Sequence, residues 1–441
     1  MDKLSFFYND EFKVLNFLEN NEEYVNGQIM VDISQEEIAD KVGVSKHKIK
    51  EIIDILCENG YLEKGINASK YQSDDLLSFD AFNNEYKKVR QYKKYVITDK
   101  GHQALNDLKE RDNLRKASNY KCASFFAGVG GIDLGFEKNG FEITYANEFD
   151  SKAIHTYEYN SDLKVDKRDI NEVVNVLQSG NDPFDGKKFD IFLAGFPCQA
   201  FSIAGYREGF DDKKGRGNLF FELMKIAREL KPSVMFLENV KNLVGHDKGK
   251  TFTIIKDTLE AEGYHIKYQV LNSMEYGNVP QNRERIYIVA FRDEEKCNQF
   301  RFPFPVQLKN NLKNVLNYTS KVEDRFYYTD KFMHYDVLKE SMKSQDTVYQ
   351  WRRVYVRENK NNVCPTLTAN MGTGGHNVPL ILTDYGIRKL TPKECFKLQG
   401  YPESFELPKD IAMSCLYKQA GNSVSVSVIE RIAKEILRVL D

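Results

Sequence analysis

Short apolar runs alternate with amphipathic stretches between about residues 120 and 300. Each run is bounded by charges or turn residues, which predicts a buried strand, and the stretches between the runs have the spacing of helices. Strands that alternate with helices predict parallel β-α-β units and a doubly wound α/β fold. The apolar runs are KCASFF, FEITYANE, FDIFLAG, SVMFLENV and RIYIVAF.

The hydrophobic pattern differs on both sides of this region. Residues 1–115 are rich in Lys, Glu, Asp and Asn and carry short helical patterns. Residues 303–385 hold proline and glycine clusters and an alternating stretch, RRVYVRE, whereas residues 386–441 return to helices. We therefore expect three parts: an N-terminal domain over 1–115, a core formed by 120–302 together with 386–441, and a smaller domain over 303–385.

A turn that contains glycine joins two predicted helices near the N-terminus. Ser34 is a typical helix N-cap, Gly43 is a typical C-terminal stop, and Ser45 opens the second helix. Two helices joined in this way form a helix-turn-helix. The second helix carries basic residues near its start, where a recognition helix meets DNA. These residues are Lys46, His47, Lys48 and Lys50.

Two further stretches, Tyr61–Glu63 and Tyr95–Thr98, are predicted to pair as a wing beside these helices. With them, the N-terminal segment resembles the winged-helix domains of bacterial transcription regulators. That resemblance implies that residues 1–115 bind DNA. The alternative is a helical protein-interaction domain with a solvated lysine face.

The charge balance excludes a uniformly basic nucleic-acid coat. The chain has 63 Lys and Arg residues against 65 Asp and Glu residues, a net charge of −2, so any DNA surface must be a local patch. An aromatic content of 12% excludes a disordered chain. No apolar run approaches the roughly 18 residues of a membrane span, and the charged N-terminus is neither a signal nor a transit peptide.

Seven cysteines are scattered along the chain, with no C-x-x-C pair and no zinc-like spacing to histidine. We therefore expect no disulfide framework and no metal site. This cysteine usage is typical of a reducing, cytoplasmic location.

A glycine-rich turn follows the first predicted strand. The strand Cys122–Phe126 leads into Ala-Gly-Val-Gly-Gly and then into a helix from about Ile132. A strand, a glycine-rich turn and a helix in this order let the backbone approach a ligand closely. The turn is not the dinucleotide pattern G-x-G-x-x-G, because Asp133 takes the place of the third glycine.

Two acids follow at the ends of the next predicted strands. Glu148 suits a ribose diol, and Asp169, beside Ile170, has the place to hold an adenine ring and its amino group. Glycines and two acids at three successive strand ends predict an adenosyl ligand. The alternative is that both acids are ordinary loop or capping residues.

A cysteine, an acid and a guanidinium are predicted at this same edge of the sheet. Pro197 fixes the backbone just before Cys198, and a cysteine at the end of a strand faces the ligand crevice. Glu238 ends another strand, and Arg285 precedes a third. Taken singly, each has a structural explanation, since a cysteine after proline is more often buried than catalytic. Their combination indicates an active site.

A thiolate next to S-adenosyl-L-methionine indicates methylation of an unactivated carbon such as cytosine C5. Addition of the Cys198 thiolate to C6 makes C5 nucleophilic, provided that N3 is protonated or hydrogen-bonded. Glu238 can supply that contact, and Arg285 can hold O2. C5 then attacks the sulfonium methyl group, and loss of H5 with β-elimination frees the cysteine.

The ordered motifs over residues 122–441 resemble those of DNA (cytosine-5)-methyltransferases. They are FAGVGGIDLGF, NEFD, GFPCQAFSIAG, FLENVKN, VPQNRERIYIVAF, RKLTPKECFKLQGYP and YKQAGNSV. The resemblance implies a doubly wound, Rossmann-like methyltransferase core, a target-recognition domain at 303–385, and S-adenosyl-L-homocysteine as a product.

The resemblance also implies roles for individual residues. It implies Cys198 as the nucleophile and Glu238 as the acid on cytosine N3. It implies Arg283 and Arg285 as base and backbone contacts. The residues that it implies for S-adenosyl-L-methionine are Phe126, Gly128, Gly131, Glu148, Phe149, Asp169, Ile170, Pro197, Leu219, Asn422 and Ser423.

Contacts to DNA are expected from the motifs and from the recognition region. In the family, the loop at 202–218 closes over a base flipped out of the duplex, and Thr366 helps to position that cytosine. Arginine is the usual reader of guanine, and Gly372, Gly374 and Gly375 allow close approach to DNA. The alternatives are a solvated loop and plain β-structure with surface arginines. The expected DNA contacts are Gln199, Ser202, Arg207, Gln281, Arg352, Arg353 and Thr366.

These observations predict a sequence-specific DNA cytosine-5 methyltransferase of a bacterial restriction-modification system, acting as a monomer on double-stranded DNA by base flipping. The N-terminal domain would read a second sequence, such as the operator of its own gene. One alternative is an RNA cytosine-5 methyltransferase, but the long, arginine-bearing region 303–385 favours duplex DNA. Another is a transcription regulator with an inactive methyltransferase half, but the intact Cys198, Glu238 and Arg285 favour an enzyme.

Overall fold

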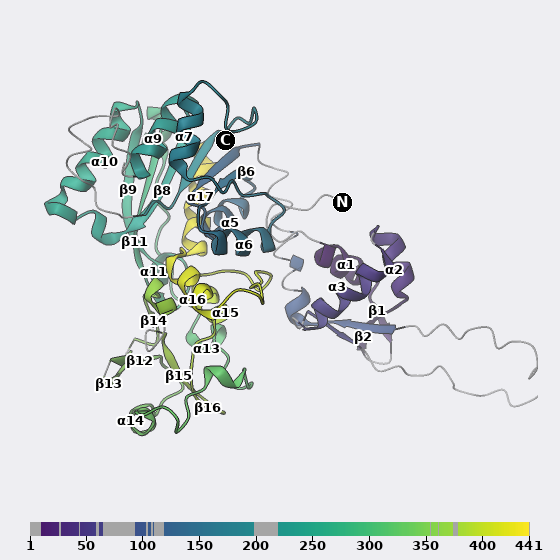
Figure 1. Cartoon of the computed structure of the whole chain (residues 1–441). Helices are drawn as coiled ribbons and strands as arrows, with labels where there is room; N and C mark the ends of the chain where they lie inside the picture. The colour runs from purple at the N-terminus through teal and green to yellow at the C-terminus, as the bar shows by residue number, and fades with distance from the viewer. Residues whose placement is uncertain are drawn as a thin grey trace, which may run out of the picture. The chain divides into compact units, whose positions relative to one another are not determined.

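The computed structural model describes most of the chain, with gaps in both halves. The described residues are 10–25, 28–43, 45–58, 61–64, 93–102, 105–106, 109, 119–197, 219–352, 354–359, 361–373 and 378–440. The chain divides into two compact units, residues 1–109 and 110–441. Figure 1 shows the helices and strands of both units. Each unit has buried residues of its own.

The described residues of the first unit include helices α1, α2 and α3, further helical residues between 99 and 109, and a four-stranded sheet of order β1-β2-β4-β3. Ser34 caps α2 by accepting a hydrogen bond from the amide of Glu37, and Gly43 ends that helix with a φ of 78°. Strands β3 and β4 pair antiparallel, with Glu63 opposite Val96, as the sequence predicts. The elements are α1 (Asp10–Glu19), β1 (Glu23–Val25), β2 (Gln28–Ile33), α2 (Gln35–Val42), α3 (Lys46–Glu58), β3 (Leu62–Lys64) and β4 (Lys93–Ile97).

The second unit contains a six-stranded sheet of order β6-β5-β7-β8-β11-β9. Strands β5 to β8 are parallel, as predicted, but β11 runs antiparallel to both β8 and β9. The parallel prediction was wrong for β11 because only a short connection joins β9 to it, and parallel neighbours need a longer crossover. The strands are β5 (Lys121–Phe125), β6 (Glu142–Asn147), β7 (Ile191–Ala194), β8 (Val234–Val240), β9 (His265–Asn272) and β11 (Glu284–Phe291).

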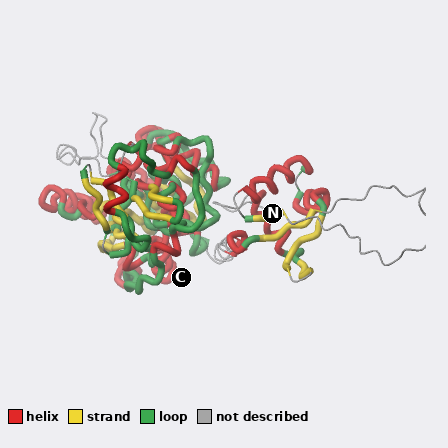
Figure 2. Tube along the Cα trace, turned by 90° about the horizontal axis from the view of Figure 1, so that it is seen from below, coloured by secondary structure: helices red, strands yellow, loops and turns green. Residues whose placement is uncertain are grey.

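Helices cover both faces of this sheet. One buried cluster joins the sheet to α7, α9 and α10, and a second joins the opposite face to α5 and α17. Figure 2 shows these strands in yellow among the red helices. The doubly wound prediction is confirmed. The helices of these layers and of the sheet's edges are α5 (Gly131–Glu137), α6 (Ser151–Asn160), α7 (Ile170–Gln178), α9 (Leu219–Leu230), α10 (Lys250–Ala261), α11 (Ser273–Tyr276), α12 (Glu294–Gln299), α15 (Pro392–Lys397), α16 (Met413–Asn422) and α17 (Val426–Leu440).

The region expected to recognise DNA forms a second, four-stranded sheet of order β13-β12-β15-β16. It has a buried cluster of its own, which includes Leu338, Tyr349 and Trp351. The sheet extends beyond residue 385, because its last strand ends at Lys389. The elements are α13 (Leu312–Val315), α14 (Tyr335–Ser341), β12 (Tyr349–Arg352), β13 (Tyr355–Glu358), β15 (Leu380–Thr383) and β16 (Gly386–Lys389), with β10 (Gln281–Asn282) and β14 (Cys364–Pro365) pairing separately.

A buried ion pair joins this small sheet to helix α15. Arg388 on β16 is 0% exposed. Its guanidinium donates to both carboxylate oxygens of Glu394, at 2.8 and 2.6 Å. The same carboxylate accepts a hydrogen bond from the amide of Thr391, which closes a capping box at the start of α15. Each charge is therefore compensated inside the protein.

We predict that Arg388→Met lowers the free energy of unfolding by about 3–5 kcal/mol, because it leaves a buried carboxylate without its cation. Guanidinium denaturation followed by the fluorescence of Trp351 measures this, since Trp351 is the chain's single tryptophan and belongs to the same small sheet. Arg325→Met is the control, because its partner Glu323 is 64% exposed, and it should change stability by less than about 0.5 kcal/mol. Equal midpoints for the two variants would contradict the prediction.

Candidate active site

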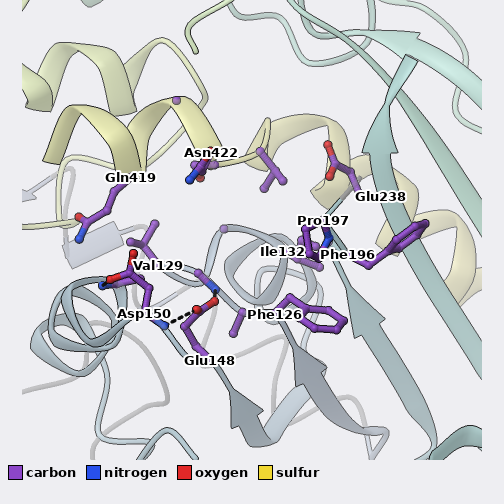
Figure 3. A pocket seen from close by; sticks show the side chains of 18 of the residues that line it. Phe126, Val129, Ile132, Glu148, Asp150, Phe196, Pro197, Glu238, Gln419 and Asn422 are labelled. Atoms are coloured by element: carbon purple, nitrogen blue, oxygen red, sulfur yellow. Dashed lines mark hydrogen bonds between the residues drawn. The ribbon is translucent and has the colours of Figure 1, made fainter. Parts of the chain in front are cut away.

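A cavity of about 700 Å³ opens where the carboxyl ends of β5 to β8 meet the start of β11. Glu148 and Asp150 lie on one side of it and Glu238 on the other (Figure 3). The end of α16 completes the wall with Asn422 and Ser423. The sequence-predicted residues that line this cavity are Phe126, Gly128, Gly131, Glu148, Phe149, Pro197, Leu219, Glu238, Arg283, Arg285, Asn422 and Ser423.

The glycine-rich turn after β5 has backbone angles that favour glycine. Gly128 and Gly130 have φ values of 57° and 84°, and residues with a Cβ rarely adopt this region. Gly131 has a different constraint, because a Cβ there would collide with the hydroxyl of Tyr401. The turn therefore keeps its backbone exposed to the cavity while the helix α5 starts directly behind it.

Three main-chain amides hold the Glu148 carboxylate in place. Its Oε2 accepts a hydrogen bond from Gly128 at 2.8 Å, and its Oε1 accepts from Phe149 and Asp150 at 2.8 and 2.7 Å. Carboxylate oxygens can accept further hydrogen bonds, so this fixed acid can still bind a ribose diol. The neighbouring Phe149 is 72% exposed and offers an aromatic surface at the cavity.

Asp169 and Ile170 are not among the residues that line the cavity. The Asp169 side chain caps α7 by accepting from the amide of Asn171 at 2.8 Å, and Ile170 is buried. The strand expected just before Asp169 is replaced by an isolated bridge between Asn147 and Asp166. Contact of this pair with an adenine ring stays a prediction.

Glu238 is a buried acid that faces the cavity from the end of β8. It is 8% exposed, and its Oε1 lies 3.2 Å from Nε of Arg285. That oxygen accepts no hydrogen bond from any residue that the structure describes. Burial raises the pKa of Glu238, and the cations of Arg285 and Arg283 offset only part of this effect. The carboxyl group is therefore a better proton holder than an exposed glutamate.

Asn239 connects this strand to the chain that precedes Cys198. Its side-chain amide donates to the carbonyl oxygen of Phe196 at 2.9 Å, and the residue is 4% exposed. This role of Asn239 was not predicted from the sequence, although Asn239 directly follows Glu238 in the FLENV strand. Asp150 was missed as well; it lines the cavity and pairs with Lys418 at 3.1 Å.

Two residues expected to touch DNA are instead occupied inside the protein. Gln281 is 0% exposed, and its side chain donates to the Leu398 carbonyl and accepts from the Leu367 amide. Arg283 is 1% exposed, and its guanidinium donates to main-chain carbonyls. Nε of Arg283 has no hydrogen-bond partner among the described residues, and Arg283 also lines the cavity. Contact of Gln281 and Arg283 with DNA therefore stays a prediction.

The remaining DNA predictions have different outcomes. Arg352 is exposed at the end of β12, and the hydroxyl of Thr366 donates to the carbonyl of Asn282 at 2.7 Å. A Cβ on Gly372 would collide with the carbonyl of Ser414, so this glycine allows packing against α16 rather than approach to DNA. Cys198, Gln199, Ser202, Arg207, Arg353, Gly374 and Gly375 lie outside the described residues, as does the rest of the loop up to residue 218.

Within the described part of the chain, no cluster of three His, Cys, Asp or Glu side chains has the arrangement of a metal site. The same residues include no helix that is both long and apolar enough to cross a membrane.

Comparisons with known proteins agree with this arrangement. Residues 120–438 match the model of the C-5 cytosine-specific DNA methylase family. The chain is 58% identical over 320 residues to the type II methyltransferase M.Bsp6I of Bacillus sp. (strain RFL6), covering 72% of this chain and 98% of that protein. It is 36% identical over 339 residues to M.HhaI of Haemophilus parahaemolyticus, covering 73% and 95%.

Solved structures share the fold. The S. pombe Dnmt2 methyltransferase superposes with a TM-score of 0.54 at 16% identity, over 73% of this chain and 99% of that one. A Spodoptera frugiperda DNMT2 mutant gives a TM-score of 0.52 at 20% identity, over 72% and 100%. The Rossmann-like fold is therefore confirmed, and the match over residues 120–438 shows that the chain belongs to the C-5 cytosine-specific DNA methylase family and is a DNA methyltransferase.

Proposed function

We propose that this enzyme transfers the methyl group of S-adenosyl-L-methionine to cytosine C5 within a specific double-stranded DNA sequence, as a type II modification enzyme and as a monomer. One observation carries the proposal. A buried acid with a carboxylate oxygen that accepts no hydrogen bond from the described residues shares a cavity with a glycine-rich turn and a fixed acid. Sequencing the 5-methylcytosines that the purified protein places on a plasmid tests it and maps the site.

The residues on one side of the cavity fit an adenosyl cofactor. Glu148 offers a preoriented carboxylate, the Gly128–Gly131 turn offers exposed backbone, and Phe149 offers an aromatic surface. When bound there, S-adenosyl-L-methionine supplies an electrophilic methyl group. Asn422 and Ser423 form the facing wall.

The residues on the other side fit a cytosine. Pro197 and Glu238 both line the cavity, and Cys198 directly follows Pro197 in the sequence, which supports Cys198 as the nucleophile. Its thiolate adds to C6, the electrons of the C5–C6 double bond move to form a C4–C5 double bond, and N3 gains a proton, so that C5 becomes the nucleophilic carbon of an enamine. After methyl transfer, loss of the C5 proton and β-elimination release the thiolate.

Glu238 and Arg285 support the charge changes on the ring. Because burial raises the pKa of Glu238, this group takes up a proton more readily than an exposed glutamate and can share it with N3 at the moment of thiolate addition. Arg285, whose Nε is 3.2 Å from Glu238, keeps a positive charge beside the O2 edge. The pair is oriented before the base arrives, because both side chains are largely buried.

The first unit supports a second DNA-binding function, which we also propose. Lys46, His47, Lys48 and Lys50 are exposed at the start of α3, while Ile49 between them is buried. This helix therefore anchors its apolar face and presents cations on the other side, as a recognition helix does. The family match begins only at residue 120, so this unit is not needed for methyl transfer. We propose that it binds the operator of its own gene.

Cys198→Ser should abolish methyl transfer while cofactor binding stays near the wild-type value. A hydroxyl provides almost no nucleophilic anion near neutral pH, whereas a thiol ionises within a few pKa units. Radiolabelled methyl transfer to DNA measures the loss. On DNA that carries 5-fluorocytosine, only the wild type should form a covalent adduct. A comparable methylation rate in the variant would show that the nucleophile is another residue.

Glu238→Gln should lower the single-turnover rate by about 10²–10⁴, because an amide cannot deliver a proton to N3. Glu222→Gln is the matched control. Glu222 is also a buried glutamate with a basic partner, Lys225 at 2.9 Å, but it lies outside the cavity lining. The control should stay within about threefold of the wild type. A Glu238→Gln rate within the same range, at saturating DNA, would exclude the acid role.

The triple change Lys46→Ala, Lys48→Ala and Lys50→Ala should leave the methylation rate near wild type in low salt and remove protection of DNA upstream of the gene. Phosphate attraction is local and acts within a Debye length of about 8–10 Å, so clustered lysines decide it. Footprinting measures the protection. A shortened protein that begins at about Asn113, and so lacks the first unit, should behave in the same way. An unchanged footprint in the triple variant, or none in the wild type, would exclude operator binding; the remaining roles would be non-specific DNA affinity or dimerisation.

A further inference from the structure

The segment from Cys364 to Thr373 is held between two parts of the chain that are distant in sequence. On one side, β14 pairs in parallel with β10, and the Leu367 amide donates to Oε1 of Gln281 at 3.2 Å. On the other side, the segment packs on α16 so closely that a Cβ on Gly421 would collide with the backbone of Thr368. The segment leads from the recognition sheet to the cavity wall, so its position affects both.

Arg283 joins these two sides through one side chain. Its Nη1 donates to the carbonyl of Leu367 at 2.7 Å, and its Nη2 donates to the carbonyls of Ser423 and, at 3.3 Å, Gly421. Ser423 is part of the proposed cofactor wall, whereas Leu367 directly follows Thr366, an exposed residue that we propose to contact DNA. The guanidinium therefore bonds both to the wall of the proposed cofactor site and to the backbone next to the proposed DNA contact.

The planar guanidinium makes this connection stiff. Its N–H groups point in fixed directions, so the Leu367 and Ser423 carbonyls can keep their hydrogen bonds only in one relative position. Arg283 is 1% exposed, and water cannot replace a lost acceptor at such a depth without cost. Movement of the Ser423 wall is therefore passed on to Leu367, and the reverse also holds.

We propose that Arg283 is a positioning residue that couples occupation of the cofactor cavity to binding of target DNA. This inference rests on the proposed function, which assigns the cofactor to the Ser423 side of Arg283 and the target DNA to the Thr366 side. A ligand that holds the 421–423 wall also holds Leu367 and Thr366 in the position that the DNA requires. By linkage, DNA tightens cofactor binding by the same factor.

The experiment measures this coupling in the full-length protein. The dissociation constant of S-adenosyl-L-homocysteine is determined with and without a short duplex that carries the mapped methylation site. The wild type should bind it about 5- to 150-fold more tightly with the duplex, the usual range of coupling. Arg283→Lys keeps the charge but replaces the planar, rigid guanidinium with a single ammonium on a flexible stem, so its ratio should fall to within about twofold of unity.

Two further variants make the result specific. Arg431→Lys is the matched control, because Arg431 also donates to two main-chain carbonyls, those of Tyr276 and Phe304. Arg431 does not line the cavity, so the ratio of dissociation constants should equal that of the wild type. Gln281→Met removes the acceptor of the Leu367 amide and should lower the ratio as well. If Arg283→Lys does not fold by circular dichroism, Gln281→Met alone decides the question.

The outcomes are distinguishable. Failure of the wild type to bind S-adenosyl-L-homocysteine would overturn the proposed function itself. Binding that is equally tight with and without DNA in the wild type would overturn only the coupling. An Arg283→Lys protein could lose affinity for both ligands and keep the wild-type ratio of dissociation constants without and with the duplex. That result would show that Arg283 has only a structural role and would also overturn the inference.

Discussion

The close packing of α17 against α5 is the constraint on which the methyltransferase unit depends. A Cβ at Gly135 would lie 2.6 Å from Cγ2 of Ile429, so the two helices approach closely only because residue 135 is glycine. The apolar stripe of α17 then closes the second face of the sheet. This brings the preceding turn, with Ser423, next to Gly131 of the cofactor loop. Without this contact, the cavity would lose one wall.

Charge is managed differently in the two parts of this unit. In the small sheet, Arg388 donates to both carboxylate oxygens of Glu394, so each charge has its counter-ion and the pair joins two elements. At the cavity, Glu238 has a cation nearby but an oxygen that accepts no hydrogen bond from the described residues. Buried polar atoms usually find partners, so an incompletely bonded acid in a cavity is a typical sign of a group that acts on a ligand.

The two units of the chain have separate cores and separate chemistry. The family match covers the second unit, where strand ends build one cavity. In the first unit, the hydrophobic sides of α2 and α3 pack inward and leave lysines exposed on α3. The DNA methyltransferase unit is thus accompanied by a second compact unit with a core of its own, to which we assign a separate DNA-binding role as a proposal.

The sequence by itself determined the elements and the residues at strand ends. The spacing of hydrophobic residues decides which segments form helices and which form strands. The carboxyl ends of parallel strands meet at one edge of the sheet, so Glu148, Pro197 and Glu238 were correctly expected in one cavity. Only the tertiary structure decided the direction of β11 and the roles of Gln281, Arg283 and Gly372. The partners of these three residues, such as Leu398, Ser423 and Ser414, lie far along the chain. A polar residue in a motif looks the same whether its hydrogen bonds go to DNA or to buried carbonyls, and only the folded chain shows which acceptors surround it.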